Sequence, residues 1–198
     1  MAPEGPSLTP ALIVQAYCQG IFPMADDDGT IGWYSPTQRA VFPLDAFHVP
    51  KTLAKTVRQA KFAIRVDGDF EGVMRACAAR ESTWISEEIV AAYVALHRLG
   101  RAHSVEAWRD GVLVGGLYGV ALGGAFMGES MFSRATDASK VCLVALVERM
   151  RARGFVLLDS QFPTTHLQRF GQVVIPREDY LAQLDAALRL PCRFVDDP

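Results

Sequence analysis

Three apolar segments that follow one another in the middle of the chain constrain the fold more than any other feature. They cover residues 104–109, 112–121 and 125–130. The first two are separated only by Asp110 and Gly111, a pair that favours the two-residue turn of a β-hairpin. A gap of two glycines, Gly123 and Gly124, precedes the third segment. The sequence therefore predicts consecutive strands of one sheet.

Helical segments flank these strands on both sides. Thr9 and Pro10 open the first helix, and Ser86 is placed to cap another helix, whose first turn carries two glutamates. The stretch 22–36 is predicted as a loop rich in aromatic residues. The predicted helices cover residues 10–19, 50–60, 70–79, 87–99, 138–153 and 178–188, and two further strands cover 62–66 and 155–160.

This order of elements is typical of an α+β fold with a central mixed sheet. It is similar to the order in acyltransferases related to the GCN5 N-acetyltransferases. The second predicted helix ends near Ala60, which is the candidate domain boundary. We therefore expect a small N-terminal domain at 1–60 and a domain like the GCN5-related N-acetyltransferases at 61–198.

The composition argues against several classes of protein. Half of the 198 residues are hydrophobic, yet no apolar run reaches the roughly 18–20 residues that cross a bilayer. The N-terminus lacks the basic and apolar regions of a signal peptide. The four cysteines form no Cys-x-x-Cys pair, and the four histidines have no metal-binding spacing. We expect a cytoplasmic protein that binds no membrane, metal or cofactor.

A run of basic residues contrasts with the net charge of −2. No acidic residue lies between Asp45 and Asp67. The run either forms a solvated helix face or contacts phosphates, because phosphate contacts need only a local positive potential. It consists of Lys51, Lys55, Arg58, Lys61 and Arg65.

Several common catalytic and cofactor-binding motifs are missing from the sequence. Residues 128–132 begin like a nucleophile elbow, but Phe132 stands in place of the second glycine. The glycines in 115–119 form no dinucleotide-binding G-x-G-x-x-G sequence, and there is no phosphate-binding P-loop. Residues 134–140 contain no glycine, unlike the pyrophosphate loop of a coenzyme-A-dependent acetyltransferase.

Polar side chains in apolar surroundings are the remaining candidates for a site. Glu129 follows an apolar run, and it is costly to bury unless it is paired, although on an alternating strand it could face solvent. Asp159 and Gln161 end a strand, where ligand contacts are common and residues two apart share a face. Asp159 could instead cap the following turn. An isolated tryptophan such as Trp84 is more often a core residue than a ligand contact.

The sequence resembles the leucyl/phenylalanyl-tRNA–protein transferase family from Tyr17 to about Leu184. Each matching segment is modest, but their common order makes the resemblance specific. The segments are GIFPM at 20–24, WYSP at 33–36, RAV at 39–41, TWI at 83–85, AHSVE at 102–106, VGGLYGV at 114–120, GESMFSR at 128–134, ASK at 138–140, LDSQ at 158–161, IPR at 175–177 and DYL at 179–181.

The resemblance implies an enzyme that takes Leu or Phe, and less readily Met, from aminoacyl-tRNA. It attaches this residue to proteins that begin with Arg or Lys, which marks them for degradation, and uses no ATP, metal or acyl-coenzyme A. Asp159 and Gln161 match the family's catalytic pair. Glu129 matches its substrate-binding carboxylate, and Trp84 the aromatic residue that holds the terminal adenosine. The remaining expected substrate contacts are Trp33 and the pocket residues Leu117, Phe126, Leu143, Met150 and Leu158.

These residues suit direct aminolysis of an aminoacyl ester. The protein is expected to be a monomer. The ester is already activated, and an α-amino group with a reference pKa of about 7.7–8.0 needs only a modest base. We expect Gln161 to hydrogen-bond the amine with Asp159 behind it, and Glu129 to pair with the acceptor's cationic side chain or amine. Alanine at Asp159 or Gln161 should leave the fold intact and abolish turnover.

Two other functions are compatible with the sequence. One is a coenzyme-A-dependent N-acetyltransferase, against which the missing pyrophosphate loop counts, and which binding of acetyl-coenzyme A would reveal. The other is a non-catalytic module that binds tRNA or peptide, which would bind without turnover.

Overall fold

The computed structural model describes residues 8–196, so the first seven residues of the predicted N-terminal domain and the last two of 61–198 lie outside it. The helices are α1 (Pro10–Cys18), the 3-10 helix η1 (Leu44–Ala46), α2 (Lys51–Arg58), α3 (Phe70–Ala78), α4 (Glu87–Arg98), α5 (Ala138–Ala152), α6 (Thr165–Gln168) and α7 (Arg177–Leu188). The strands are β1 (Phe22–Ala25), β2 (Ile31–Tyr34), β3 (Gln38–Phe42), β4 (Ala63–Val66), β5 (Ala102–Arg109), β6 (Val112–Leu122), β7 (Ala125–Ser133), β8 (Leu157–Gln161) and β9 (Val173–Pro176).

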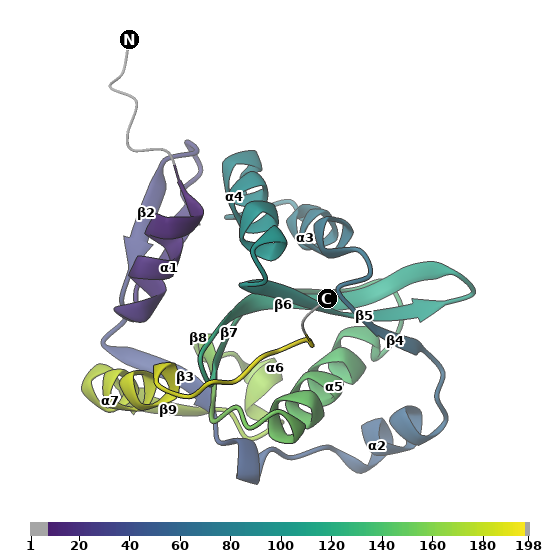
Figure 1. Ribbon diagram of the computed structural model, residues 1–198. Helices are drawn as coiled ribbons and strands as arrows, with labels where there is room; N and C mark the ends of the chain where they lie inside the picture. The colour runs from purple at the N-terminus through teal and green to yellow at the C-terminus, as the bar shows by residue number, and fades with distance from the viewer. Residues whose placement is uncertain (1–7, 197–198) are drawn as a thin grey trace.

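A seven-stranded mixed sheet forms the centre of the molecule, in the order β4-β5-β6-β7-β8-β3-β9 (Figure 1). Strands β7 and β8 are parallel and are connected through α5, whereas the other neighbouring pairs are antiparallel. The β5–β6 turn has positive φ at both Asp110 (53°) and Gly111 (75°), which is the conformation that a tight two-residue hairpin requires. The predicted hairpins and the central mixed sheet of an α+β fold are therefore confirmed.

Helices cover both faces of this sheet. In Figure 1, α3 and α4 lie over one face, and α5 lies against the other with α2 beside it. Two hydrophobic clusters fill these layers, one built around the side chains of α3 and α4 and the other around those of α5. Local signals fix several helix ends: the Ser86 hydroxyl accepts a hydrogen bond from the Ile89 N–H, as predicted for the start of α4.

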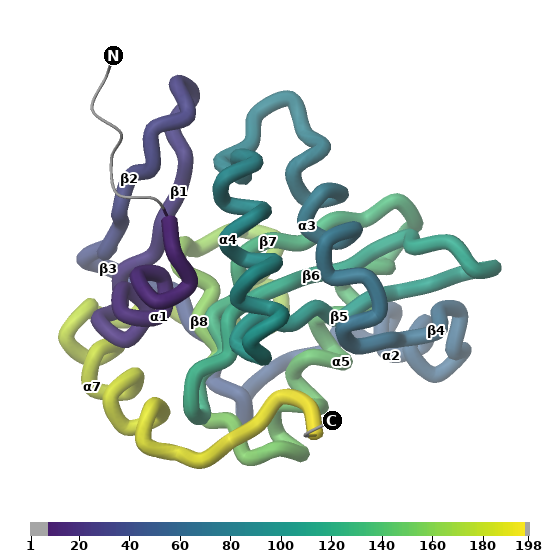
Figure 2. The backbone as a smooth tube through the Cα atoms, turned by 45° about the horizontal axis from the view of Figure 1, so that its top comes forward, coloured from purple at the N-terminus to yellow at the C-terminus, as the bar shows by residue number. Residues whose placement is uncertain are grey.

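The N-terminal part of the chain differs from the prediction in two places. The stretch 22–36 was expected to be a loop, but it contains the antiparallel hairpin β1–β2. Strand β3, which was not predicted, crosses into the main sheet and pairs with β8 and β9. Figure 2 shows α1 and the β1–β2 hairpin beside α4, so this N-terminal layer packs on the side of the sheet that α3 and α4 cover.

The parallel pair β7–β8 separates soon after it begins. The two strands are in register only from Ala125 opposite Leu157 to Met127 opposite Asp159, whereas β7 continues to Ser133. Beyond this point the sheet has no backbone pairing between its two central strands, which leaves room for a site. Every helix in residues 8–196 is too short or too polar to span a lipid bilayer.

Candidate active site

A cavity of about 320 Å³ lies where β7 and β8 diverge. Its wall includes Tyr118 and Trp84 from the side of α3 and α4, and Leu117 and Leu143 from the side of α5. Because adjacent residues of a strand point to opposite faces, a lining that includes both Leu117 and Tyr118 means that the cavity reaches both sides of the sheet. Most of its surface is apolar, and the part of the wall where Glu129 and Gln161 meet, with Gln161 Nε2 2.8 Å from Glu129 Oε1, is its polar end.

Glu129 on β7 provides the central polar group of this cavity. Its Oε1 accepts a hydrogen bond from Tyr17 Oη at 2.5 Å and another from Gln161 Nε2 at 2.8 Å. Tyr17 Oη is also 2.6 Å from Tyr93 Oη, and since the Tyr17 proton goes to Glu129, Tyr93 is the donor in that pair. The carboxylate is therefore held by groups from α1, β8 and, indirectly, α4.

The second oxygen of Glu129 is closed off from solvent and has no hydrogen-bond partner among the described residues. The Tyr118 hydroxyl, also on the cavity wall, is likewise buried and has no hydrogen-bond partner among the described residues. Burial raises the pKa of Glu129 to about 8, because it outweighs the hydrogen bonds from Tyr17 and Gln161 that favour the charged form. A buried carboxyl group with a raised pKa loses its proton when a cation binds beside it, because the cation stabilises the charged form. The alternative of a solvent-facing Glu129 is wrong.

Gln161 ends β8 in a left-handed conformation, with φ of 59°. Its backbone N–H donates to Asp159 Oδ1 at 2.8 Å, and its side-chain amide nitrogen donates to Glu129. The amide oxygen of Gln161 makes no hydrogen bond to the described residues. It is therefore available to accept a hydrogen bond from a ligand at the polar end of the cavity.

Asp159 is fully buried and forms a two-point ion pair with Arg39 of β3. Arg39 Nε lies 2.9 Å from Asp159 Oδ1, and Nη2 lies 2.6 Å from Oδ2. Tyr180 of α7 also donates to Oδ2, at 2.9 Å. The Arg39 guanidinium is stacked between the rings of Phe22 and Tyr180, at 4.6 and 4.4 Å. Asp159 does cap the turn at Gln161, but most of its hydrogen-bonding capacity goes to this pair.

The other predicted substrate contacts divide into two groups. Trp84, Leu117, Leu143 and Leu158 line the cavity with Glu129, Asp159 and Gln161. The structure does not bring the remaining three to the cavity wall. Phe126 and Met150 are buried in the hydrophobic cluster on the α5 side, and Trp33 lies on β2 with 40% of its surface exposed.

The predicted basic run is divided between α2, which packs beside α5, and the edge strand β4 of the sheet. Lys51, Lys55 and Arg58 are exposed on α2, and Lys61 follows this helix. Arg65 on β4 is exposed and stacks on the ring of Trp108 at 4.8 Å. All five side chains can reach solvent, so both a solvated face and a phosphate-binding patch remain compatible with the structure.

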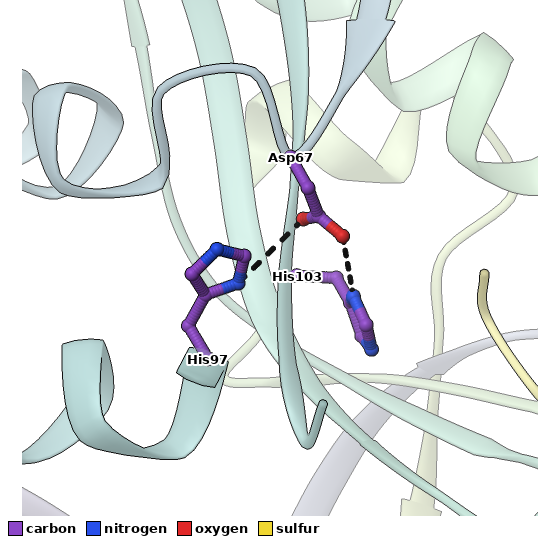
Figure 3. Close-up of side chains that lie close together, drawn as sticks. All are labelled: Asp67, His97 and His103. Carbon is purple, nitrogen blue, oxygen red and sulfur yellow. Dashed lines mark hydrogen bonds and ion pairs between the residues drawn. The ribbon is translucent and has the colours of Figure 1, made fainter. Parts of the chain in front are cut away.

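One cluster has the residue types of a metal site, although sequence spacing did not predict it. Figure 3 shows Asp67 between His97 and His103, with potential ligand atoms within 4.8 Å of one another. His97 Nδ1 lies 2.8 Å from the Ala102 carbonyl oxygen, and His103 Nδ1 lies 2.7 Å from Asp67 Oδ2. Both partners are acceptors, so each Nδ1 carries a proton and has no lone pair for a metal. The cluster is better described as a hydrogen-bonded support for the turn before α3.

Three residues that hold the polar end of the cavity were not singled out from the sequence: Arg39, Tyr17 and Tyr180. Arg39 carried a signal, because a lone arginine precedes the apolar residues of a short strand, but the sequence does not identify its partner 120 positions away. The two tyrosines lie in ordinary helical patterns. Their importance depends on tertiary contacts.

Chemically, the cavity combines an apolar compartment with an amide oxygen and an acid beside it. It can accept an apolar side chain at one end and a protonated amine or guanidinium at the other. None of the described residues on the cavity wall is a cysteine, and the Ser160 hydroxyl on that wall donates to the Ala40 carbonyl oxygen. The buried thiols of Cys77 and Cys142 have pKa values of about 12, chiefly because burial disfavours the thiolate.

Comparison with known proteins identifies the relatives of this chain. The solved structure of L-PGS from Bacillus licheniformis is 12% identical, covers 78% of this chain and 54% of its own, and gives a TM-score of only 0.42. Proteins named leucyl/phenylalanyl-tRNA–protein transferase are much nearer in sequence. Those from Gloeobacter violaceus and Rubrobacter xylanophilus are each 58% identical, over 95% and 94% of this chain and 98% of their own length.

Two family profiles match the chain in succession. The profile described as leucyl/phenylalanyl-tRNA protein transferase matches residues 41–185, and the profile of the N-terminal domain of that protein matches residues 7–37. A protein from Herpetosiphon aurantiacus with the same name is 56% identical over 94% of this chain. The chain therefore belongs to the leucyl/phenylalanyl-tRNA–protein transferase family.

Proposed function

We propose that this protein moves Leu, Phe or Met from aminoacyl-tRNA to the N-terminal Arg or Lys of acceptor proteins and so marks them for degradation. The observation that carries the proposal is the polar end of the cavity, where Gln161 Nε2 lies 2.8 Å from Glu129 Oε1. An acid and a free amide oxygen beside an apolar compartment match the cationic acceptor and the apolar donor side chain. Membership of the family supports the same reaction.

The direct test is transfer of labelled Leu from Leu-tRNA to a peptide that begins with Arg. A peptide of the same sequence that begins with Gly is the control, because it lacks the cationic side chain. Transfer to neither peptide, or equal transfer to both, would contradict the proposal.

In the proposed reaction, the acceptor's neutral α-amine attacks the carbonyl carbon of the ester and forms an amide bond. The bond to the ribose oxygen breaks, this oxygen takes up one proton from the amine, and the tRNA leaves with a free hydroxyl group. Gln161 accepts a hydrogen bond from the amine through its free amide oxygen. Asp159 positions Gln161 by accepting a hydrogen bond from its backbone N–H at 2.8 Å. Positioning of this kind can contribute roughly 7–11 kcal/mol.

Glu129 is proposed to pair with the cationic side chain of the acceptor. Its pKa of about 8 means that the empty site is mostly neutral at pH 7, and that binding of a cation must first remove a proton. The orphaned Oε2 then gains a partner. Neutral N-terminal residues would leave this oxygen unpaired, which gives a reason for a preference for Arg or Lys.

This role predicts a pH-dependent affinity for the acceptor. For an Arg-initiated peptide with an acetylated α-amine, which cannot titrate in this range, affinity should rise about twentyfold from pH 6.5 to 8.5 as Glu129 ionises. The Glu129→Gln protein keeps the same shape and should show a weak affinity that does not change with pH. Calorimetric titration measures both. An equal pH dependence in the two proteins would refute the assignment.

For the donor, we propose that Leu117, Leu143 and Leu158 surround the side chain of Leu, Phe or Met, with Phe126 and Met150 supporting them from the core. An apolar compartment separates side chains by only about 1–3 kcal/mol per methylene, so several donors should be accepted. Trp84 is proposed to stack on the terminal adenosine. The proposal for Trp33 is a contact farther along the tRNA, because its ring is 40% exposed and lies outside the cavity wall.

The basic run is proposed to bind phosphates of the acceptor stem. The Lys55→Glu/Arg58→Glu protein should lose part of its salt dependence, with the slope of log KM for aminoacyl-tRNA against log salt concentration falling by about 2. The Arg98→Glu/Arg101→Glu protein carries the same charge change on exposed residues outside the run and is the matched control. An unchanged slope in the first protein would remove the run from the tRNA site.

We further propose that residues 61–198 have the fold of the GCN5-related N-acetyltransferases, with residues 1–60 as a small domain beside it. The support is the order β4-β5-β6-β7 followed by parallel β8, the helix α5 that connects β7 to β8, and the divergence of these two strands at the cavity. In this division the small domain donates β3 to the larger sheet. Because charged tRNA is the donor, we expect the protein to work in the cytoplasm. We also expect it to be a monomer.

A further inference from the structure

Arg80, in the connection between α3 and α4, has no role in the function described above. It is exposed, and it is the one lysine or arginine among the residues that line the cavity. Its Nη2 donates to the Met131 carbonyl oxygen on β7, which fixes the guanidinium beside the cavity mouth. Within residues 8–196, no carboxylate forms an ion pair with Arg80. The other guanidinium N–H groups are therefore available to a ligand.

The charges around Arg80 show what kind of ligand suits it. Asp159 is already paired with Arg39, and among residues 8–196 Glu129 is the only other acid on the cavity wall. Glu129 is held by Tyr17 and Gln161, and its pKa of about 8 keeps it mostly neutral at pH 7. An unpaired guanidinium at the mouth of such a cavity attracts an anion, and its planar array of donors suits phosphate oxygens.

Arg80 also lies close in the chain to the aromatic side chain that faces the same cavity. Trp84 is four residues further along the same connection, and its position is fixed because its carbonyl oxygen accepts the Ala25 N–H at 3.1 Å. A tryptophan ring and a guanidinium on one wall match the two parts of a nucleotide, the base and the phosphate. Because both side chains line the same cavity, one nucleotide can contact both of them.

We infer that Arg80 binds the phosphodiester that joins the 3′-terminal nucleoside of the donor to the preceding nucleotide. The inference rests on the proposed function, since it takes the donor to be aminoacyl-tRNA. Arg80 thereby acts as a specificity residue. It lets the enzyme distinguish an aminoacyl group carried by a nucleic acid from the same group on a free nucleoside.

The test compares two donors that differ in this phosphate, Phe-tRNA and 3′-O-phenylalanyl adenosine. The Arg80→Ala protein should have a KM for Phe-tRNA about tenfold to hundredfold higher than the wild type, because a hydrogen bond between charged groups is lost. The KM for the nucleoside and the kcat for both donors should stay within about twofold. The slope of log KM for Phe-tRNA against log salt should fall by about 1.

Two further proteins make the outcome specific. Arg80→Lys keeps the charge and should recover part of the affinity for Phe-tRNA. Arg98→Ala removes an exposed arginine of α4 outside the cavity and should match the wild type with both donors. Equal losses with both donors, or no loss with either, would overturn the inference. If the wild type transferred from neither donor, the proposed function would fail instead.

Discussion

Replacing Arg39 with methionine should lower the free energy of unfolding by about 3–5 kcal/mol and reduce transfer sharply. Arg39 and Asp159 are both almost completely buried, at 1% and 0% exposure. Methionine fills much of the space but leaves the Asp159 carboxylate in the core with only the Tyr180 hydroxyl and the Gln161 N–H as partners. An unpaired buried charge is among the most destabilising defects a core can have.

The Arg39–Asp159 pair can be tested with a double-mutant cycle in urea. The double variant Arg39→Met/Asp159→Leu should be more stable than either single variant, because it removes both charges instead of leaving one of them buried. Arg75→Met is the matched control: Arg75 pairs with Glu71 and Glu87 on the surface, and its loss should cost about 1 kcal/mol or less. A loss no larger for Arg39→Met than for Arg75→Met would show that the buried pair is unimportant.

This ion pair also changes what is expected of Asp159. From the sequence, Asp159→Ala was expected to fold normally and lose only turnover. In the structure the same change leaves the Arg39 guanidinium buried among Phe22, Tyr180 and the Gly20 carbonyl oxygen. The protein should therefore lose stability as well as activity, and loss of activity alone cannot identify Asp159 as a catalytic residue.

Much of the fold could be predicted because its signals are local. The Asp110–Gly111 turn specifies a hairpin by itself, and Ser86 caps α4 through a hydrogen bond to a residue three positions away. The strands β3 and β9 have no such signals. Each is four or five residues long and is stabilised by its neighbours in the sheet, so its pattern is too short to distinguish from a loop.

The candidate site shows the same division. Glu129, Asp159 and Gln161 could be named from the sequence because they are polar residues in strands, and the structure places Gln161 within hydrogen-bond distance of the other two. Arg39 and Tyr17 could not be assigned to the site in this way, since their partners lie more than 100 residues away along the chain. Pairing at that distance is a property of the fold and leaves no local pattern.

Gln161→Asn should leave the protein about as stable as the wild type but lower kcat about 100-fold. The position has φ of 59°, a conformation that asparagine tolerates better than most residues, so the backbone turn should survive. Asparagine keeps the amide but is one methylene shorter, and it cannot reach both Glu129 Oε1 and an incoming amine. A displacement of about 1 Å is enough to cost this much when the catalytic contribution comes from positioning.

The KM for the acceptor distinguishes this positioning role from a binding role. Because Glu129 and not Gln161 is proposed to hold the cationic side chain, KM for an Arg-initiated peptide should change less than about threefold while kcat falls. Gln161→Ala should lose as much kcat and also about 1 kcal/mol of stability, because the hydrogen bond from Nε2 to Glu129 is lost, whereas positive φ costs alanine no more than glutamine. Gln168→Ala removes an exposed amide of α6 outside the cavity and should behave as the wild type. If Gln161→Asn kept near-normal kcat, the amide would not contact the attacking amine, and Glu129 or the unpaired Tyr118 hydroxyl would be left to orient it.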